Sequence, residues 1–439
     1  MREQTKDIGD AGLFDARQLG WPKMLILGVQ HTFAMFGATV LVPLLTGLDV
    51  STTLLMAGLG TLLFHFLTKG QVPVFLGSSF AFLGGYFAVA PMIDGRPNAE
   101  MLPYACGGVF CAGIVYILCS AFIRAFGAKK VMRYFPPVVT GPIIISIGLI
   151  LAPSAVKNCA SNWLLALIAL GTIIVCNIWG KGMIKIVPII LGITVSYIVA
   201  LLTNAVDFTA VIAEQRIIAA APLMLAKFDA SSIITIMPIA LATMMEHIGD
   251  ISAISATTGK NYIHEPGLHR TLLGDGFATS LSALFGGPAN TTYGENTGVL
   301  ALTKVYDPRV VRIAAVSAIL LSFFPKFAGL VNTIPVAIIG GVSLILYGMI
   351  SAIGIRNVVE NQVDFTVSRN LIIAAVILVS ALGFDAIGGI TFAVAGASVT
   401  LSGLALSAIA GITLNAILPG NSYEFNAPSE GSQAVIFKV

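Results

Sequence analysis

The sequence predicts an all-α membrane protein in which about 14 segments cross the bilayer, because one crossing needs roughly 20 apolar residues. Three observations support this fold class. Of the 439 residues, 56% are hydrophobic and only 10% are charged, whereas soluble domains carry about 25% charged residues. Apolar runs recur from Met24 to about Leu418. Two of these runs are interrupted by Pro, Gly and small polar residues at matching places in two halves of the chain.

The chain starts with a polar stretch. Residues 1–20 are mixed in charge and contain neither a central apolar run nor a small-residue cleavage site, so a secretory signal peptide is not expected. We expect residues 1–22 to form a cytoplasmic N-terminal segment and residues 419–439 to form a C-terminal tail.

The apolar runs follow in order. The first seven segments are expected near residues 23–48, 51–68, 71–93, 103–125, 135–153, 162–180 and 183–203. A polar stretch from Asn204 to Ser231 separates them from the second seven. These are expected near residues 232–256, 269–286, 288–305, 309–331, 334–355, 368–388 and 390–418.

The distribution of positive charge orients these segments. An even number of crossings places both termini on one side, and cytoplasmic connections are enriched in Lys and Arg. The even-numbered connections hold Lys69, Arg124, Lys129, Lys130, Arg133, Lys181, Lys185, Lys260, Arg270, Lys304, Arg309, Arg312, Arg356 and Arg369. The odd-numbered connections hold only Arg96, Lys157, Arg216, Lys227 and Lys326. We therefore expect a multi-pass inner-membrane protein with both termini in the cytoplasm.

The third and tenth segments do not resemble continuous apolar helices. Near Gln71 the sequence is QVPVFLGSSFAF, and near Pro288 it is PANTTYGENTGV. Non-helical backbone at membrane depth is tolerated only where it is buried in protein or lines a cavity. Two interrupted segments in corresponding places of two halves indicate the binding site of a transporter.

The two halves share further features. His31 and His247, each preceded by Gln or Glu, lie 216 positions apart, and Gly77 and Gly294 lie 217 positions apart. Because each half holds an odd number of segments, the two repeats are expected to be inverted.

Ionisable residues inside the expected segments cluster in MMEHIGD and YGENTG, which contain Glu246, His247, Asp250 and Glu295. Each such residue costs roughly 2.5 to 3.5 kcal/mol to insert into a membrane. Glu246 and Asp250 are four positions apart and therefore share one helix face. A purely structural cluster, in which the residues satisfy one another, is disfavoured because three acids and one histidine cannot all pair.

Other polar residues in apolar surroundings have plainer interpretations. His31 either packs within its helix or orients the site, and its alignment with the Glu246 cluster keeps both roles open. His65 is expected to be a packing residue, and Asp385, in the glycine-rich run GFDAIGG, is expected to be a solvated loop residue.

No metal or cofactor is expected. The cysteines, which show no CxxC spacing, are interpreted as small hydrophobic residues. The run from His264 to His269 resembles a zinc-protease motif but is one residue too long, and Pro266 breaks its helix. The glycine-rich stretches lack Gly-Lys-Ser/Thr, so no nucleotide-hydrolysing loop is expected.

The decapeptide from Glu295 to Lys304 matches the signature of the nucleobase–ascorbate transporter family: Gln, Glu or Pro, then Asn-x-Gly-x4-Thr, then Arg, Lys or Gly. The runs QHTFAMFGATVLVP, PVFLGSSFAF, PGLHR, NTTYGENTGV and GGVSLILYG also resemble the bacterial uracil permease branch of that family. The resemblance covers both halves, from about His31 to Arg356.

The resemblance implies two inverted seven-helix repeats, with short antiparallel strands in the third and tenth segments. It implies a core domain of residues 23–125 and 232–331 and a gate domain of residues 135–203 and 334–418. Dimers through the gate domain are common in the family. By position, the implied substrate-binding residues are Glu246, Glu295, Phe80, Tyr293, Gly294 and Tyr347.

This set of residues suits uracil, which offers two N–H donors and two carbonyl acceptors in one plane. Ionised carboxylates accept only, so Glu246 and Glu295 suit the N–H groups. Backbone N–H groups of half-helices after Gly77 and Gly294 suit the carbonyls, and Phe80 offers a ring for stacking.

Proton coupling is expected because buried acids are suited to carry a proton. The candidate residues are Asp250, Glu246, His247 and His31. Some uracil permeases carry His at the position of Asp250, so the order of protonation stays open.

Three alternatives stay open beside uracil import. A purine symporter for xanthine or guanine tends to carry Gln at the position of Glu295. An anion exchanger of the same fold would meet repulsion from the acids. An intramembrane hydrolase lacks support, because neither a metal-ligand spacing nor a nucleophile is evident.

The expected partners are uracil, protons and the lipid bilayer, without nucleic acid. The protein is expected to form a homodimer.

Overall fold

Long apolar helices make up most of the molecule, because a helix satisfies its own backbone hydrogen bonds inside a membrane. The computed structural model describes residues 12–93, 97–394 and 397–420. Half of the expected N-terminal segment and most of the expected C-terminal tail therefore lie outside the described residues. Seven described helices are long and apolar enough to cross a membrane, and an eighth crossing results if α15 and α16 form one bent span.

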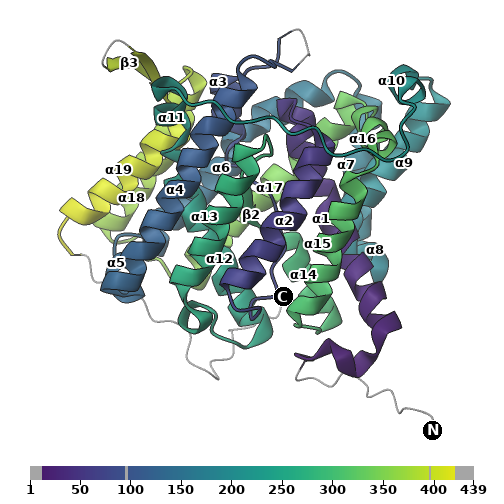
Figure 1. Cartoon of the computed structure of the whole chain (residues 1–439). Helices are drawn as coiled ribbons and strands as arrows, with labels where there is room; N and C mark the ends of the chain where they lie inside the picture. The colour runs from purple at the N-terminus through teal and green to yellow at the C-terminus, as the bar shows by residue number, and fades with distance from the viewer. Residues whose placement is uncertain (1–11, 94–96, 395–396, 421–439) are drawn as a thin grey trace.

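The elements follow the expected order along the chain (Figure 1). Those of the first half are η1 (Ala16–Leu19), α1 (Trp21–Thr46), α2 (Val50–Leu67), β1 (Leu76–Ser78), α3 (Leu83–Val89), α4 (Leu102–Phe126), α5 (Ala128–Met132), α6 (Pro137–Cys159), α7 (Trp163–Trp179), α8 (Met183–Ile186), α9 (Pro188–Leu202) and α10 (Thr209–Ala213). Those of the second half are α11 (Ala230–Ile236), α12 (Ile239–Thr258), η2 (Ile263–Gly267), α13 (Leu268–Leu284), β2 (Asn290–Thr292), α14 (Gly294–Thr303), α15 (Pro308–Ser322), α16 (Pro325–Asn332), α17 (Val336–Glu360), α18 (Ser368–Ala386), β3 (Ile390–Val394), β4 (Ala397–Leu401) and α19 (Gly403–Ile417).

The segment expected at residues 309–331 is not a straight helix. The axes of α15 and α16 differ by 89°. Pro325 opens α16, and the preceding Phe324 has an extended backbone with φ −107° and ψ 91°. Proline disfavours the helical conformation in the residue before it and cannot donate a backbone hydrogen bond. The helix therefore ends and restarts in a new direction.

The segment expected at residues 390–418 is only partly helical. Strands β3 and β4 pair antiparallel, from Ile390 opposite Leu401 to Val394 opposite Ala397, before α19 begins. Gly388 and Gly389, with φ of 80° and 87°, turn the chain out of α18. The run after these glycines is rich in β-branched residues, which favour strands.

The helices pack in two groups. In the first, α13 lies against α2 and α4, and α15 lies against α1 and α2. In the second, α17 lies against α6 and α7, and α18 lies against α6 and α19. Helix α12 contacts both groups, through α4 and α13 on one side and α6 and α19 on the other.

Glycines bring the central helices of each group into close contact. A Cβ at Gly113 of α4 would lie 2.7 Å from the carbonyl oxygen of Gly276 in α13. A Cβ at Gly354 of α17 would lie 2.8 Å from the carbonyl oxygen of Gly141 in α6. Small residues at such crossings let helix backbones approach within a membrane.

The start of the described chain is attached to the connection between α14 and α15. The Leu13 N–H donates to the carbonyl of Lys304 over 2.7 Å, and the Tyr306 N–H donates to Leu13 over 2.7 Å. The Asp15 carboxylate pairs with Arg17 and Arg309. Its hydrogen bond with Arg17 lowers the pKa of Asp15 to about 2, so this carboxylate is ionised at physiological pH.

Candidate functional site

Two strands from opposite halves of the chain meet in the middle of the bundle (Figure 1). Strands β1 and β2 pair antiparallel, with Leu76 opposite Thr292, Gly77 opposite Thr291 and Ser78 opposite Asn290. All six residues are buried. The short antiparallel strands expected in the third and tenth segments are thus confirmed.

A threonine of the preceding helix holds each strand. The Thr61 hydroxyl in α2 donates to the carbonyl of Leu76 over 3.2 Å and accepts the Leu76 N–H over 2.9 Å. The Thr279 hydroxyl in α13 donates to the carbonyl of Asn290 over 3.0 Å and accepts its N–H over 3.2 Å. Each strand is therefore fixed to a helix of its own half before it pairs across the molecule.

Further contacts fix both strands from the side. The Asn290 side-chain amide donates to the carbonyls of Met56 and Ala278, which joins β2 to α2 and α13. The Tyr293 hydroxyl donates to the carbonyl of Ser78 over 3.1 Å. Tyr293, an expected substrate residue, thus uses its hydroxyl within the strand pair.

The two interrupted segments differ in how the helix after each strand begins. Helix α14 begins at Gly294, directly after β2, whereas α3 begins only at Leu83. Gly77 lies inside β1, where a Cβ would be 2.3 Å from the Tyr293 ring. A half-helix therefore follows each glycine, as expected, but α3 starts six residues after Gly77, whereas α14 starts at Gly294 itself.

The start of α14 borders open space. Gly294 is exposed, and a Cβ there would meet no atom within 4 Å. Glu295 lies in the first turn of this helix and is partly exposed. The free N–H groups of a helix N-terminus are suited to hold a carbonyl or an anion.

Two acids of α12 lie close to this space. Glu246 and Asp250 are both partly exposed although they lie on a central helix. The Thr292 hydroxyl donates to the Asp250 carboxylate over 2.5 Å, which links α12 to β2. The Glu246 carboxylate lies within electrostatic range of Asp250, Asp275 and Glu295. The structure thus brings together the three acids that the sequence analysis selected.

Sequence analysis missed a fourth acid, Asp275 of α13. Its carboxylate lies 2.8 Å from the Nδ1 atom of His247, and both side chains are 0% exposed. His247 therefore faces α13, although it follows Glu246 directly in the chain. Asp275 could have been found from the sequence, because it is an acid inside the expected segment 269–286. Glu295 was identified in the same way.

Two of the other four histidines, His31 and His65, make contacts within the protein. The Asn296 side chain contacts the His31 Nδ1 atom over 3.0 Å and donates to the His31 carbonyl over 3.2 Å, so His31 contacts the helix that carries Glu295. His65 is buried, and its Nε2 atom lies 2.9 Å from the Val74 carbonyl, as expected for a packing residue.

An aromatic pair joins the two helix groups beside the strands. Phe80, in the turn after β1, meets Tyr347 of α17 edge to face, with ring centroids 6.0 Å apart. Both rings are buried. The sequence analysis selected these two residues from distant segments, and the structure places them in contact.

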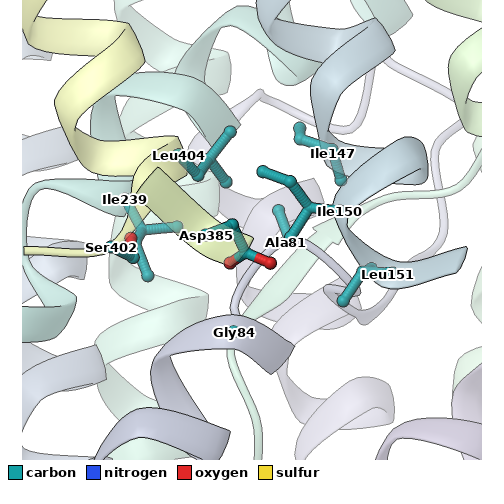
Figure 2. A pocket seen from close by; sticks show the side chains of 9 residues that line it. All are labelled: Ala81, Gly84, Ile147, Ile150, Leu151, Ile239, Asp385, Ser402 and Leu404. Carbon is teal, nitrogen blue, oxygen red and sulfur yellow. The ribbon is translucent and has the colours of Figure 1, made fainter. Parts of the chain in front are cut away.

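Next to Phe80, a narrow cleft of about 10 Å³ lies between the helix groups (Figure 2). It is lined by Ala81 and Gly84 on one side and by residues of α6, α18 and α19 on the other. Asp385, in the last turn of α18, lines the cleft and is partly buried. The expectation that Asp385 is a solvated loop residue is therefore wrong, because α18 continues through this position.

Among the described residues, no three His, Cys, Asp or Glu side chains are placed to hold a metal ion. His264 precedes the kink at Glu265, whereas His269 lies in α13.

Interrupted segments that meet beside acids inside the helix bundle are typical of a membrane transporter. The chain belongs to the Permease family, whose model matches residues 22–388. It is therefore a multi-pass membrane transporter and not an enzyme, and the resemblance to this family is confirmed.

Several curated relatives match nearly the whole chain. The uracil permease of Bacillus caldolyticus is 44% identical over 412 residues, which cover 90% of this chain and 92% of the relative. The uracil permease of Bacillus subtilis (strain 168) is 40% identical, with 89% and 91% covered. That of Escherichia coli (strain K12) is 37% identical, with 89% and 90% covered.

Solved structures share the fold at low identity. The transmembrane domain of the cyanobacterium bicarbonate transporter BicA aligns with a TM-score of 0.62 at 16% identity, covering 86% of this chain and 98% of that domain. The murine Solute Carrier 26 family member A9 anion transporter, in the inward-facing state, aligns with a TM-score of 0.64 at 11% identity, covering 94% and 73%. These similarities concern the fold alone.

Proposed function

We propose that this protein imports uracil together with protons across the inner membrane. Relatives named uracil permease are 37% to 44% identical over about nine tenths of the chain. The observation that carries the proposal is that the acids Glu246 and Glu295 lie beside the open space at the start of α14.

The site offers complementary groups for a pyrimidine ring. The carboxylates of Glu246 and Glu295 accept from the two ring N–H groups, because an ionised carboxylate has no donor. The N–H groups at the start of α14 donate to a ring carbonyl. Phe80 stacks on the base, and Tyr347 closes the site from α17. The edge-to-face contact between these two rings lies at the boundary of the two helix groups.

The two helix groups serve as the core and gate domains. The first group corresponds to the expected residues 23–125 and 232–331, and the second to residues 135–203 and 334–418. In this proposal about 14 segments cross the bilayer as two inverted repeats, counting the interrupted segments and the shorter helices α7, α9 and α19. Both termini are cytoplasmic, and two copies pair through the gate domain.

Proton coupling involves Asp250 together with Glu246. The Thr292 hydroxyl donates to Asp250, so a change of protonation at Asp250 acts directly on strand β2. Two carboxylates on one face of a buried helix repel each other when both are ionised. One proton shared between them lets the loaded carrier reorient. His31 supports the site through Asn296.

Transport by the purified protein tests this proposal. Proteoliposomes with an acidic exterior should accumulate radiolabelled uracil, and the accumulation should collapse when the pH gradient is dissipated. Unlabelled uracil and 5-fluorouracil should compete, whereas xanthine and guanine should not. Stronger competition by xanthine than by uracil would establish the purine alternative.

Glu295 gives a sharper test of the site. In Glu295→Gln, one acceptor oxygen becomes an NH₂ donor that faces a substrate N–H. A buried polar group left unpaired costs about 1 to 3 kcal/mol, so uracil binding should weaken roughly tenfold or more. The measurement is uracil affinity by calorimetry, with the exposed Glu100→Gln as the matched control. Unchanged affinity in Glu295→Gln would remove this residue from the site.

The anion-exchange alternative rests on the fold of the bicarbonate and anion transporters above. Four acids at or beside the site, namely Glu246, Asp250, Asp275 and Glu295, disfavour an anionic substrate by charge repulsion. Bicarbonate and sulfate should therefore leave uracil uptake unaffected in the same proteoliposomes.

A further inference from the structure

A large apolar groove lies away from the strands, between α4, α5, α12 and α19. Its volume is about 590 Å³, within the roughly 300 to 1,000 Å³ of typical small-molecule sites. Cys119 and Phe122 of α4, Met244 of α12 and Ile412 of α19 contribute to its wall. Lys130 of α5 and Tyr134 also line it.

The surroundings of the groove determine what can fill it. Helix α4 and the stretch Ala230–Thr258 that contains α12 are both long and apolar enough to cross a membrane. Phe122 and Phe126 of α4 are 57% and 58% exposed. Exposed aromatic side chains on a membrane-crossing helix face lipid tails, so an acyl chain is the natural occupant of the groove.

The charged residue among those that line the groove is cationic. Residues 124–133 contain four basic residues and no acid, and Lys130 of this run lines the groove itself. Basic pockets between membrane-crossing helices on the cytoplasmic side bind anionic lipid headgroups. The apolar wall of the groove and its lysine thus match the two parts of one ligand.

We propose that an anionic phospholipid binds in this groove, with an acyl chain between α4, α12 and α19 and its headgroup at Lys130. Helix α4 belongs to the first helix group and α19 to the second, so the lipid bridges both. Met244 lies on the same helix as Glu246, two residues before it. Bound lipid therefore favours the arrangement of the two groups that keeps the groove open.

Lipid binding in the groove does not depend on which substrate the protein transports. The effect of the bound lipid on transport, in contrast, rests on the proposed function. Binding is therefore measured without substrate. Delipidated protein is mixed with phosphatidylglycerol or phosphatidylcholine and examined by native mass spectrometry. Lys130→Gln should weaken phosphatidylglycerol binding about fivefold, since one lysine near an anionic headgroup contributes about 1 kcal/mol. Lys185→Gln, in another basic connection and exposed, is the matched control and should bind as the parent does.

The reactivity of Cys119 locates the bound lipid. Cys106, Cys159 and Cys176 are buried and Cys111 is partly exposed, so the measurement uses the Cys111→Ala background. Phosphatidylglycerol should slow maleimide labelling of Cys119. In the presence of the same lipid, Lys130→Gln should restore the faster labelling rate. Equal protection by phosphatidylcholine would overturn the headgroup assignment, and no protection by either lipid would overturn the site. Uracil uptake in vesicles of the two lipids then reports the effect on transport.

Discussion

At the scale of single residues, the hydrogen bond between Thr292 and Asp250 connects the acids of α12 to the strand that precedes Gly294. Thr292 donates to the carboxylate over 2.5 Å. A carboxylate only accepts, whereas a carboxylic acid also donates. A proton arriving at Asp250 therefore changes what this side chain can offer to its neighbours, and it does so next to strand β2.

Asp250→Asn should separate binding from coupling. The amide oxygen still accepts from Thr292, but the side chain no longer takes up a proton. Uracil exchange between equal pools should persist, whereas accumulation driven by a pH gradient should be lost. Proteoliposome uptake with and without the gradient measures both. If Asp250→Asn still accumulates uracil, the coupling proton resides elsewhere and Glu246 becomes the candidate.

The contact between His247 and Asp275 has a different expected role. Both side chains are fully buried, and removing one partner of a buried pair destabilises a protein by about 3 to 5 kcal/mol. Asp275→Ala should therefore lower the melting temperature in detergent, and adding His247→Ala should cause little further loss. Additive effects of the two substitutions would show that the residues do not act as a pair.

At the scale of elements, the two threonines that hold strands β1 and β2 are the most informative feature, and we call them the strand anchors. Thr61 and Thr279 each bind both backbone groups of one strand residue. Thr→Val at either position keeps the shape but leaves these groups unpaired, at about 1 to 3 kcal/mol. Both variants should lower thermal stability and weaken uracil binding, although neither hydroxyl is expected to touch the substrate.

Two controls accompany the anchor variants. Thr→Ser at the same positions retains the hydroxyl and should restore uracil affinity. Thr172→Val removes a hydroxyl that donates only to Ile168 of its own helix over 2.7 Å and should leave affinity unchanged. Normal uracil affinity in both anchor variants would show that the strands hold their place without the threonines.

The sequence predicted the elements that carry a local chemical signature. The interruptions at β1 and β2 were predictable because Pro, Gly and small polar residues do not make a continuous apolar helix, and the resemblance to the family implied that strands fill them. Strands β3 and β4 were missed because a run of β-branched apolar residues has the same hydropathy as a membrane helix. The bend before Pro325 was missed for the same reason, since hydropathy does not report direction.

The candidate site was predictable in its residues but not in its pairings. Glu246, Asp250 and Glu295 stand out because acids are rare inside apolar segments. That His247 faces Asp275 and His31 faces Asn296 depends on how distant helices pack. Periodicity within one segment does not contain this information.

At the scale of the whole molecule, orientation in the membrane is open to direct measurement. Helices α5 and α10 lie at opposite ends of the bundle (Figure 1). Tags near Lys129 and Lys260 should report the cytoplasm, because both connections are basic, and a tag near Asp207 should report the periplasm. If Lys260 and Asp207 proved to be on one side, the stretch that carries Glu246 would not cross the membrane.

The order of synthesis gives the strand pair a further consequence. Strand β1 leaves the ribosome 216 residues ahead of its partner position in β2, from Leu76 to Thr292. At roughly 5 to 20 residues per second, this delay lasts about 10 to 40 s. During that interval the cross-molecule partner of β1 does not exist, yet Thr61 has already been made and can hold both backbone groups of Leu76. We therefore expect Thr61 to satisfy the backbone groups of this strand residue until the second half of the chain arrives.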